Sequence, residues 1–295
     1  MASSGPTLDA LRREIDEIDD GIHDLLMRRT AVVEKVRSHK GSDNGPFLRP
    51  AREAAILRRL VQRHTGNFPV AALVHIWREI MSALVRLQGP FSVAVFAPAE
   101  FPHYWDLARD HFGASTPMTR FSNVEQVVRA AGESGNTVGV LPWPHESKPE
   151  PWWRHLASEE PDALRVISRL PFLATGRPDD PQAVAVAQMP QEPSGADRSL
   201  LAIATQAELS RSRFLSSAKA AGFAPQFVSE WQDSEPGAAW WYLIEIGEFL
   251  AADDPRLERL REAPDGSIWR VVRVGGYAEP LGGAQAAGSG TTRRA

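Results

Sequence analysis

The sequence predicts a multi-domain protein in which an all-α segment of three helices precedes an α/β (α+β) region. Two observations carry this prediction. Apolar residues recur at spacings of three and four up to residue 88, a pattern typical of packed helices. After the Gln-Gly-Pro turn at 88–90, the run FSVAVFA at 91–97 alternates as a strand does. The length of 295 residues is enough for about two domains.

The first expected helix is unusually long. Its apolar seam runs from Leu8 to Val36, and the turn cluster at 41–46 ends it. A second helix is expected over 51–64 and a third after Pro69. The two shorter helices cannot cover a seam of this length, so we expect the long helices of two chains to pair in an intertwined homodimer.

The second part alternates expected strands and helices, which is typical of α/β and α+β folds. Strands are expected at 92–97, 137–141, 164–170, 182–188, 199–205, 240–247 and 268–274. Helices are expected at 103–112, 123–134, 208–221 and 255–262.

Composition also changes along the chain. Only Trp77 of the nine tryptophans lies in the first hundred residues, and the first ninety hold 14 Lys and Arg against 11 Asp and Glu. We therefore divide the chain into an all-α domain, an α/β domain, a second α+β domain and a disordered tail. Their expected bounds are 1–89, 90–196, 197–281 and 282–295.

The overall composition excludes several classes of protein. A net charge of −4 argues against a dedicated nucleic-acid binder. With no cysteine there is no disulfide framework, thiolate metal site or cysteine nucleophile. The first twenty residues contain acids and no continuous apolar run, so neither a secretory signal nor a membrane anchor is expected. We expect a cytoplasmic protein.

Polar residues occupy positions where the periodicity of the three helices predicts an apolar residue. Arg29 and Lys40 continue the first seam, Glu53 extends the second and Gln88 the third. One interpretation is structural: Arg29 and Glu53 form a buried ion pair and Gln88 fixes the register. The other is a pocket inside the bundle that binds a small polyanion, because arginine forks clamp carboxylates well. The neighbouring arginines at 58, 59 and 63 are interpreted as a solvated helix face.

Three strings in this segment resemble the all-helical chorismate mutases. They are the Leu-x-x-x-Ile-Asp-type start of the long helix, RPAREAAILRRL at 49–60 and WREIMSALVRLQ at 77–88. The resemblance implies an entwined dimer, chorismate as substrate, and no cofactor or metal. It also implies a role for each matching position. Arg12 would reach in from the other subunit, Arg29 and Arg52 would hold the substrate carboxylates, Lys40 and Gln88 would contact the ether oxygen, and Glu53 would hold the ring hydroxyl.

Two further substrate-contacting positions depart from the family pattern. Arg49 stands where many members have an acid, and Leu84 stands where some have a small polar residue. The implied activity is the rearrangement of chorismate to prephenate in phenylalanine and tyrosine biosynthesis. The alternatives are isochorismate pyruvate lyase activity on the same scaffold, a non-catalytic regulator that binds an aromatic-pathway metabolite, and a bifunctional chorismate mutase/prephenate dehydratase.

The second part resembles known modules more faintly. HFG at 111–113 and VGVLPWPHES at 138–147 are similar to strings in the first lobe of prephenate dehydratases. The Thr-Arg-Asp-type catalytic motif of that family is missing, so we expect no dehydratase activity. Residues 197–279 resemble a degenerate ACT regulatory domain. The tryptophan pairs at 152–153 and 240–241 are either core anchors or walls of an effector pocket.

Overall fold

The N-terminal part of the molecule is helical, as predicted. The structure is a computed structural model that describes residues 6–40, 47–144, 151–174, 180–232, 237–262 and 266–282, apart from the side chains of residues 39, 40 and 227. Of the tail expected at 282–295, residues 283–295 lie outside the described residues. The three helices are α1 (Leu8–Lys40), α2 (Pro50–Gln62) and α3 (Val70–Gln88).

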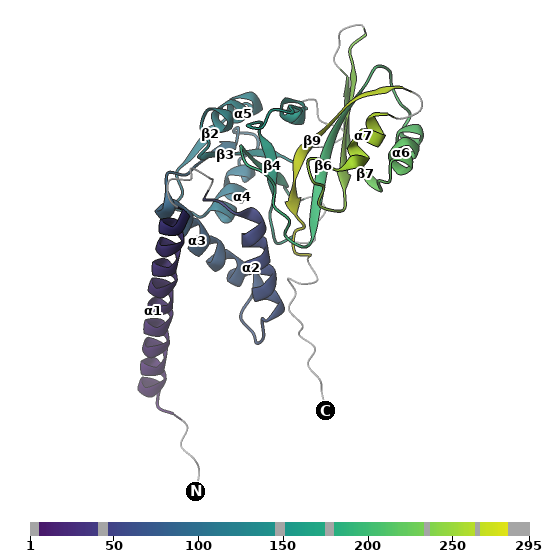
Figure 1. Ribbon diagram of the computed structural model, residues 1–295. Coiled ribbons are helices and arrows are strands. Elements are labelled where there is room, and N and C mark those ends of the chain that lie inside the picture. The colour runs from purple at the N-terminus through teal and green to yellow at the C-terminus, as the bar shows by residue number, and fades with distance from the viewer. Residues whose placement is uncertain are drawn as a thin grey trace, which may run out of the picture.

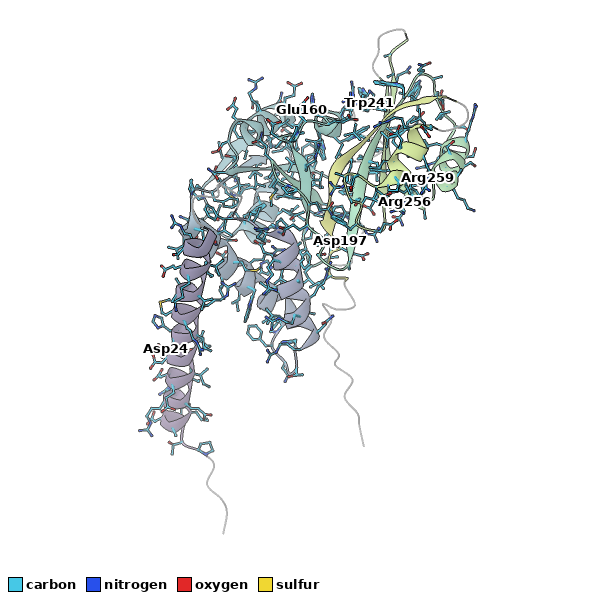
Figure 2. All side chains as sticks on the ribbon, in the orientation of Figure 1. Asp24, Glu160, Asp197, Trp241, Arg256 and Arg259 are labelled. Carbon is cyan, nitrogen blue, oxygen red and sulfur yellow. The ribbon has the colours of Figure 1, made fainter. Side chains whose placement is uncertain are left out.

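Helix α1 projects away from the rest of the described chain, and no other described element lies beside most of its length (Figure 1). Asp24 marks a point well along this projection (Figure 2). The hydroxyl of Thr7 accepts a hydrogen bond from the amide of Ala10 at 3.3 Å, which caps the first turn. The apolar stripe expected on α3 is buried against its neighbours, including Val74 and Met81.

The remainder of the described chain builds one nine-stranded sheet with helices on it, which confirms the α/β expectation. The strands are β1 Ser92–Phe96, β2 Met118–Phe121, β3 Thr137–Pro142, β4 Arg165–Leu170, β5 Ala183–Ala187, β6 Asp197–Thr205, β7 Pro225–Gln232, β8 Trp240–Ile246 and β9 Ile268–Ala278. The helices are α4 His103–Phe112, α5 Val124–Glu133, the short 3-10 helix η1 Trp152–Leu156, α6 Arg211–Ala220 and α7 Pro255–Arg261.

Two strands, β2 and β7, were not predicted. The strand order is β2-β1-β3-β5-β4-β9-β6-β8-β7, so these two strands form the two edges of the sheet. An edge strand pairs on one side only and keeps more polar residues, which weakens its hydrophobic pattern. The seven strands and four helices that were expected all have counterparts in the structure.

The sheet consists of two halves that meet where β4 and β9 run parallel. Val166 faces Gly275 at this point, and Gly275 adopts a positive φ of 121°. A Cβ atom on Gly275 would lie 2.3 Å from the carbonyl oxygen of Val166, so only glycine permits this approach. The boundary expected at 196/197 falls between the two halves and stays a prediction. No described helix is long and apolar enough to cross a membrane.

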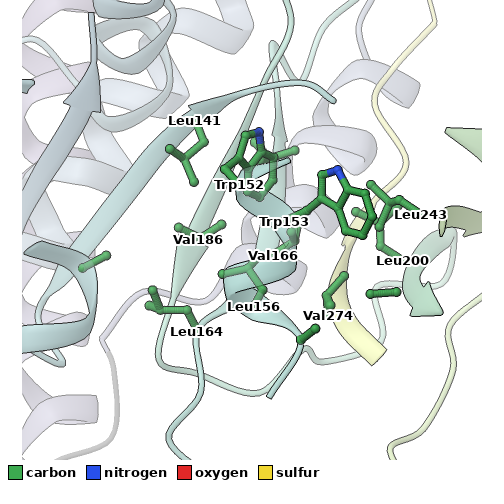
Figure 3. Packing of buried hydrophobic residues seen from close by; sticks show 14 of the residues in the cluster. Leu141, Trp152, Trp153, Leu156, Leu164, Val166, Val186, Leu200, Leu243 and Val274 are labelled. Atoms are coloured by element: carbon green, nitrogen blue, oxygen red, sulfur yellow. The ribbon is translucent and has the colours of Figure 1, made fainter. Parts of the chain in front are cut away.

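Two tryptophans pack across this junction. Trp152 and Trp153 of η1 are almost completely buried. Trp152 lies toward Leu141 of β3, whereas Trp153 lies toward Leu200 and Leu243 of the second half (Figure 3). One hydrophobic cluster therefore extends through both halves of the sheet.

Candidate active site in the helical segment

The three helices bring one residue each to a shared buried cluster: Arg29 of α1, Glu53 of α2 and Arg78 of α3. Nη1 of Arg78 donates a hydrogen bond to Oε2 of Glu53 at 2.7 Å, and these side chains are only 5% and 13% exposed. A buried charge is tolerated when it is paired and hydrogen-bonded. One of the two interpretations of the sequence paired Glu53 with Arg29, but the ion pair that forms is with Arg78.

Arg29 is held close to this pair without joining it. Its Nη1 atom is buried and has no hydrogen-bond partner within the described part of the chain. Burial lowers the pKa of the Arg29 guanidinium, and the nearby charge of Glu53 opposes this shift. A buried guanidinium nitrogen without a protein acceptor is the arrangement expected of a group that receives an anion.

Burial also shifts both partners of the ion pair toward their neutral forms. It raises the pKa of the Glu53 carboxyl, against the positive charges of Arg78 and Arg29. It lowers the pKa of Arg78, against the charge and hydrogen bond of Glu53. The pair therefore depends on both members, because burial leaves each charge poorly solvated and each is stabilised by the other.

Arg78 was missed by the sequence reasoning, although a signal was present. It lies four residues after Val74 and three before Met81, so it shares their buried stripe. Its guanidinium also stands 5.2 Å from the ring centroid of Phe172, which belongs to the segment after β4. The cluster around Glu53 is thus in contact with the sheet region.

The other expected site residues whose side chains are described are not part of the cluster formed by Arg29, Glu53 and Arg78. Arg52 is exposed on α2, and Leu84 is buried on α3. Nε2 of Gln88 donates to the carbonyl oxygen of Leu84 at 2.9 Å. Arg49, which was expected to contact the substrate, pairs with Glu192 in the loop between β5 and β6. The Lys40 side chain lies outside the described residues.

Arg12 lies far from this cluster within one chain. Its exposed side chain contacts Asp9 at 3.4 Å. It precedes Arg29 by 17 positions on the same continuous helix, a separation of about 25 Å along the axis. Arg12 therefore cannot reach the site of its own chain. This agrees with the expectation that Arg12 contributes to the site of a second subunit.

The prediction that Arg58 lies on a solvated helix face is wrong. Its Nη1 donates to the carbonyl oxygen and hydroxyl of Ser194 at 3.2 and 2.9 Å. Its Nη2 donates to the carbonyl oxygens of Ala196 and Glu279 at 2.7 and 2.8 Å. Asp197, the first residue of β6 and labelled in Figure 2, accepts hydrogen bonds from the backbone amides of Ser194 and Gly195 in the same turn. Helix α2 is thereby fixed to the sheet.

A buried histidine beside Arg78 makes stability depend on pH. Burial and the charge of Arg78 hold the pKa of His111 well below its ordinary value of 6.5. The unfolded chain then binds the additional proton, so the contribution of His111 is complete above pH 6.5 and is lost as the pH falls below it. Between pH 7.5 and 5.5, we expect the wild type to lose about 1 kcal/mol more unfolding free energy than His111→Leu. Urea denaturation at both pH values measures this, and equal losses would contradict it.

The helical segment matches the model of a known protein family. Residues 11–89 match the model of chorismate mutase type II. This segment is a chorismate mutase domain. The bifunctional chorismate mutase/prephenate dehydratase of Aquifex aeolicus is 35% identical over 140 residues, which are 46% of this chain and 38% of that protein. The chain thus spans well under half the length of this curated relative.

Two solved structures are similar to the chain at low identity. GqqA, described as a novel type of quorum quenching acylase, is 13% identical with a TM-score of 0.46, over 63% of this chain and 94% of that one. Prephenate dehydratase from Streptococcus mutans is 12% identical with a TM-score of 0.44, over 65% and 99%. Within the described residues, no group of three His, Cys, Asp or Glu is placed to hold a metal beside the chorismate mutase domain or elsewhere.

Proposed function

We propose that this chain is a chorismate mutase that rearranges chorismate to prephenate in the cytoplasm, in phenylalanine and tyrosine biosynthesis. The observation that carries the proposal is the buried, unpartnered guanidinium nitrogen of Arg29, which lies beside Glu53 in a matched chorismate mutase domain. Chorismate is a dianion, and its rearrangement is intramolecular. An enzyme for this reaction must hold the substrate in a compact conformer and stabilise charge that grows on the ether oxygen.

Each residue of the proposed site has a role in that task. Arg29 and Arg52 would bind the two carboxylates, with Arg12 supplied by the second subunit. Lys40 and Gln88 would donate hydrogen bonds to the ether oxygen. Gln88 has two amide hydrogens, and only one is needed for the carbonyl of Leu84.

Glu53 would accept a hydrogen bond from the ring hydroxyl of the substrate. Arg78 occupies Oε2 of this carboxylate, which leaves Oε1 as the acceptor for the substrate. Arg49 and Leu84 would border the substrate and set its affinity. No step of this scheme transfers a proton to or from the protein.

A product assay tests the proposal and its rivals. The full chain is incubated with chorismate and, separately, with isochorismate, and the products are separated by chromatography. Prephenate from chorismate is expected. Salicylate and pyruvate from isochorismate would identify a pyruvate lyase instead, and no turnover of either compound would favour a metabolite-binding regulator.

We propose that the C-terminal region is regulatory or structural and has no dehydratase activity. Prephenate carries two carboxylates. The pocket at the carboxyl ends of the parallel strands has no positively charged residue among its described lining. A bifunctional enzyme is the second candidate, because the Aquifex aeolicus relative is named as one. Phenylpyruvate formed from prephenate without acid treatment would establish it.

The second subunit is proposed from the exposed seam of α1. Eight apolar residues of the seam are between 41% and 65% exposed in the single chain, although exposed apolar patches of this length are rare on monomers. They are Leu8, Leu11, Ile15, Ile18, Ile22, Leu25, Val32 and Val36. Pairing of two such seams would bury them and deliver Arg12 to the other chain.

We expect the double variant Ile15→Glu/Ile22→Glu to be monomeric and to lose most chorismate mutase activity, because two charges on the seam oppose pairing. Sedimentation velocity measures the oligomeric state, and the product assay measures the activity. Asp20→Asn, on the opposite face of α1, is the matched control and should remain dimeric and active. A wild-type chain that sediments as a monomer at micromolar concentration would contradict the proposed dimer.

A further inference from the structure

The ring of Phe172 joins the sheet region to the helical segment. Phe172 follows β4 and is only 5% exposed. It belongs to a hydrophobic cluster that also contains Leu57 of α2 and Met81 of α3, both within the chorismate mutase domain. A side chain of the sheet region is therefore part of the core of the helical segment.

The backbone at Phe172 is held by the ends of both halves of the sheet. The carbonyl oxygen of Phe172 accepts a hydrogen bond from the amide of Leu281 at 2.7 Å, and the amide of Ala174 donates to the carbonyl oxygen of Leu281 at 2.9 Å. Residues 171–174 follow β4 and residues 279–281 follow β9, and these are the two strands at the junction of the halves. The sheet thereby fixes the backbone that carries the Phe172 ring.

Two arginines of the helical segment stand near this ring. The guanidinium of Arg78 lies 5.2 Å from the ring centroid of Phe172, and that of Arg58 lies 6.0 Å from it. An aromatic face attracts a guanidinium, most strongly where water is excluded. Arg78 is the closer of the two, and its side chain is only 5% exposed. Contact with Phe172 therefore restricts where the Arg78 guanidinium can lie.

Arg78 in turn holds the carboxylate of Glu53. The hydrogen bond from Nη1 of Arg78 to Oε2 of Glu53 is 2.7 Å long. One guanidinium thus contacts an aromatic ring of the sheet region and a carboxylate of the helical segment. A change in the position of the ring changes the geometry of the hydrogen bond to Glu53.

We propose that Phe172 is a positioning residue of the mutase site: its ring keeps Arg78 where the guanidinium pairs with Glu53. This inference rests on the proposed function, in which Glu53 accepts a hydrogen bond from the ring hydroxyl of chorismate. Phe172 does not touch the substrate in this scheme. The sheet region acts on the reaction through Arg78 alone.

The charged groups along this path determine how its loss depends on pH. Burial raises the pKa of Glu53, and Arg78 of α3 and Arg29 of α1 oppose that shift. Arg78 also faces His111 of α4, which burial and the charge of Arg78 keep neutral near pH 7 by holding its pKa well below 6.5. If Arg78 is held less firmly, the pKa of Glu53 rises further. Glu53 then becomes protonated at a higher pH, and a neutral carboxyl is a weaker acceptor than a carboxylate.

The pH profile of kcat/KM for chorismate tests the proposal in Phe172→Leu, which keeps an apolar side chain and removes the ring. The acid midpoint, where kcat/KM is half its plateau value, should move to a higher pH. Below both midpoints kcat/KM should be about three- to tenfold lower than in the wild type, whereas the plateau values should differ by less than about twofold.

The folded fraction is measured by circular dichroism at each pH, and the rates are normalised to it. A purely structural role for Phe172 would then leave the midpoint unchanged. Phe172→Met, a second variant without the ring, should give the same shift and replaces Phe172→Leu if that variant folds poorly.

Phe223→Leu is the matched control. Phe223 is 2% exposed, and the guanidinium of Arg256, labelled in Figure 2, stands 5.0 Å from its ring centroid. Phe223 belongs to a cluster of the second half of the sheet, so its variant loses the same kind of contact without affecting Arg78. Its midpoint should equal that of the wild type.

An unchanged midpoint in the Phe172 variants, or an equal shift in Phe223→Leu, would overturn this inference and leave the proposed function intact. A wild-type chain that does not rearrange chorismate would overturn the proposed function and this inference with it.

Discussion

Replacing Arg78 with methionine is expected to lower the free energy of unfolding by about 3–5 kcal/mol, the usual effect of removing one partner from a buried ion pair. The variant leaves the Glu53 carboxylate buried without its hydrogen bond at 2.7 Å. It also removes the guanidinium that stands 5.2 Å from the Phe172 ring. Urea denaturation at one fixed protein concentration measures the change, because subunit association contributes to stability.

The pH dependence of this variant identifies the cause. Without Arg78, burial raises the pKa of Glu53 further, and the folded chain then binds a proton that the unfolded chain releases. A group with a raised folded pKa contributes stability below its unfolded pKa and loses that contribution as the pH rises through the folded pKa. Arg78→Met should therefore lose more stability at pH 7 than at pH 5. An equal loss at both pH values would attribute the effect to packing alone.

A second substitution separates the charge from the cavity. Arg78→Met/Glu53→Met should recover much of the lost stability, because it removes the unpaired carboxylate as well. Arg59→Met, an exposed arginine on α2, is the matched control and should change the unfolding free energy by less than about 0.5 kcal/mol. If the double variant were less stable than Arg78→Met, the ion pair would not be the source of the stabilisation.

Arg78 and Arg58 also show where sequence reasoning reached its limit. Periodicity predicted all three N-terminal helices and the buried stripe of α3, because each depends on contacts between near neighbours in the chain. It could not predict that Arg58 donates to Ser194, Ala196 and Glu279, since those acceptors are more than 130 positions away. An arginine that packs against a distant element has the same local pattern as a solvated one.

The candidate site, like the fold, was predicted from the sequence only in part. The sequence placed Arg29 and Glu53 on inward faces of their helices, and the structure brings both to one buried cluster. It did not predict that Arg78 takes the ion pair and leaves Nη1 of Arg29 without an acceptor, because partner choice depends on how three helices meet. The edge strands β2 and β7 were missed for a related reason: their pairing is set by neighbours that are distant in sequence.

The largest functional effect is expected for Arg29→Ala, which should lower kcat/KM for chorismate by about 100- to 1000-fold. The guanidinium supplies donors that the proposed site offers to a carboxylate, and water in the resulting space cannot replace their charge. Arg29→Lys should recover only part of the activity, because an ammonium group cannot form the paired hydrogen bonds of the fork. Initial rates measured from the loss of chorismate absorbance give both values.

Stability distinguishes this effect from that of Arg78→Met. Glu53 keeps its ion pair with Arg78 when Arg29 is removed, and the buried nitrogen that is lost has no partner within the described chain. The unfolding free energy of Arg29→Ala should therefore stay within about 1 kcal/mol of the wild type. Arg28→Ala, the exposed neighbour on α1, should keep both activity and stability. Full activity in Arg29→Ala would show that this residue does not belong to the site. Lost activity with preserved stability is the result expected of a cation that binds the substrate, because its charge is then paired with the substrate and not with another residue of the chain.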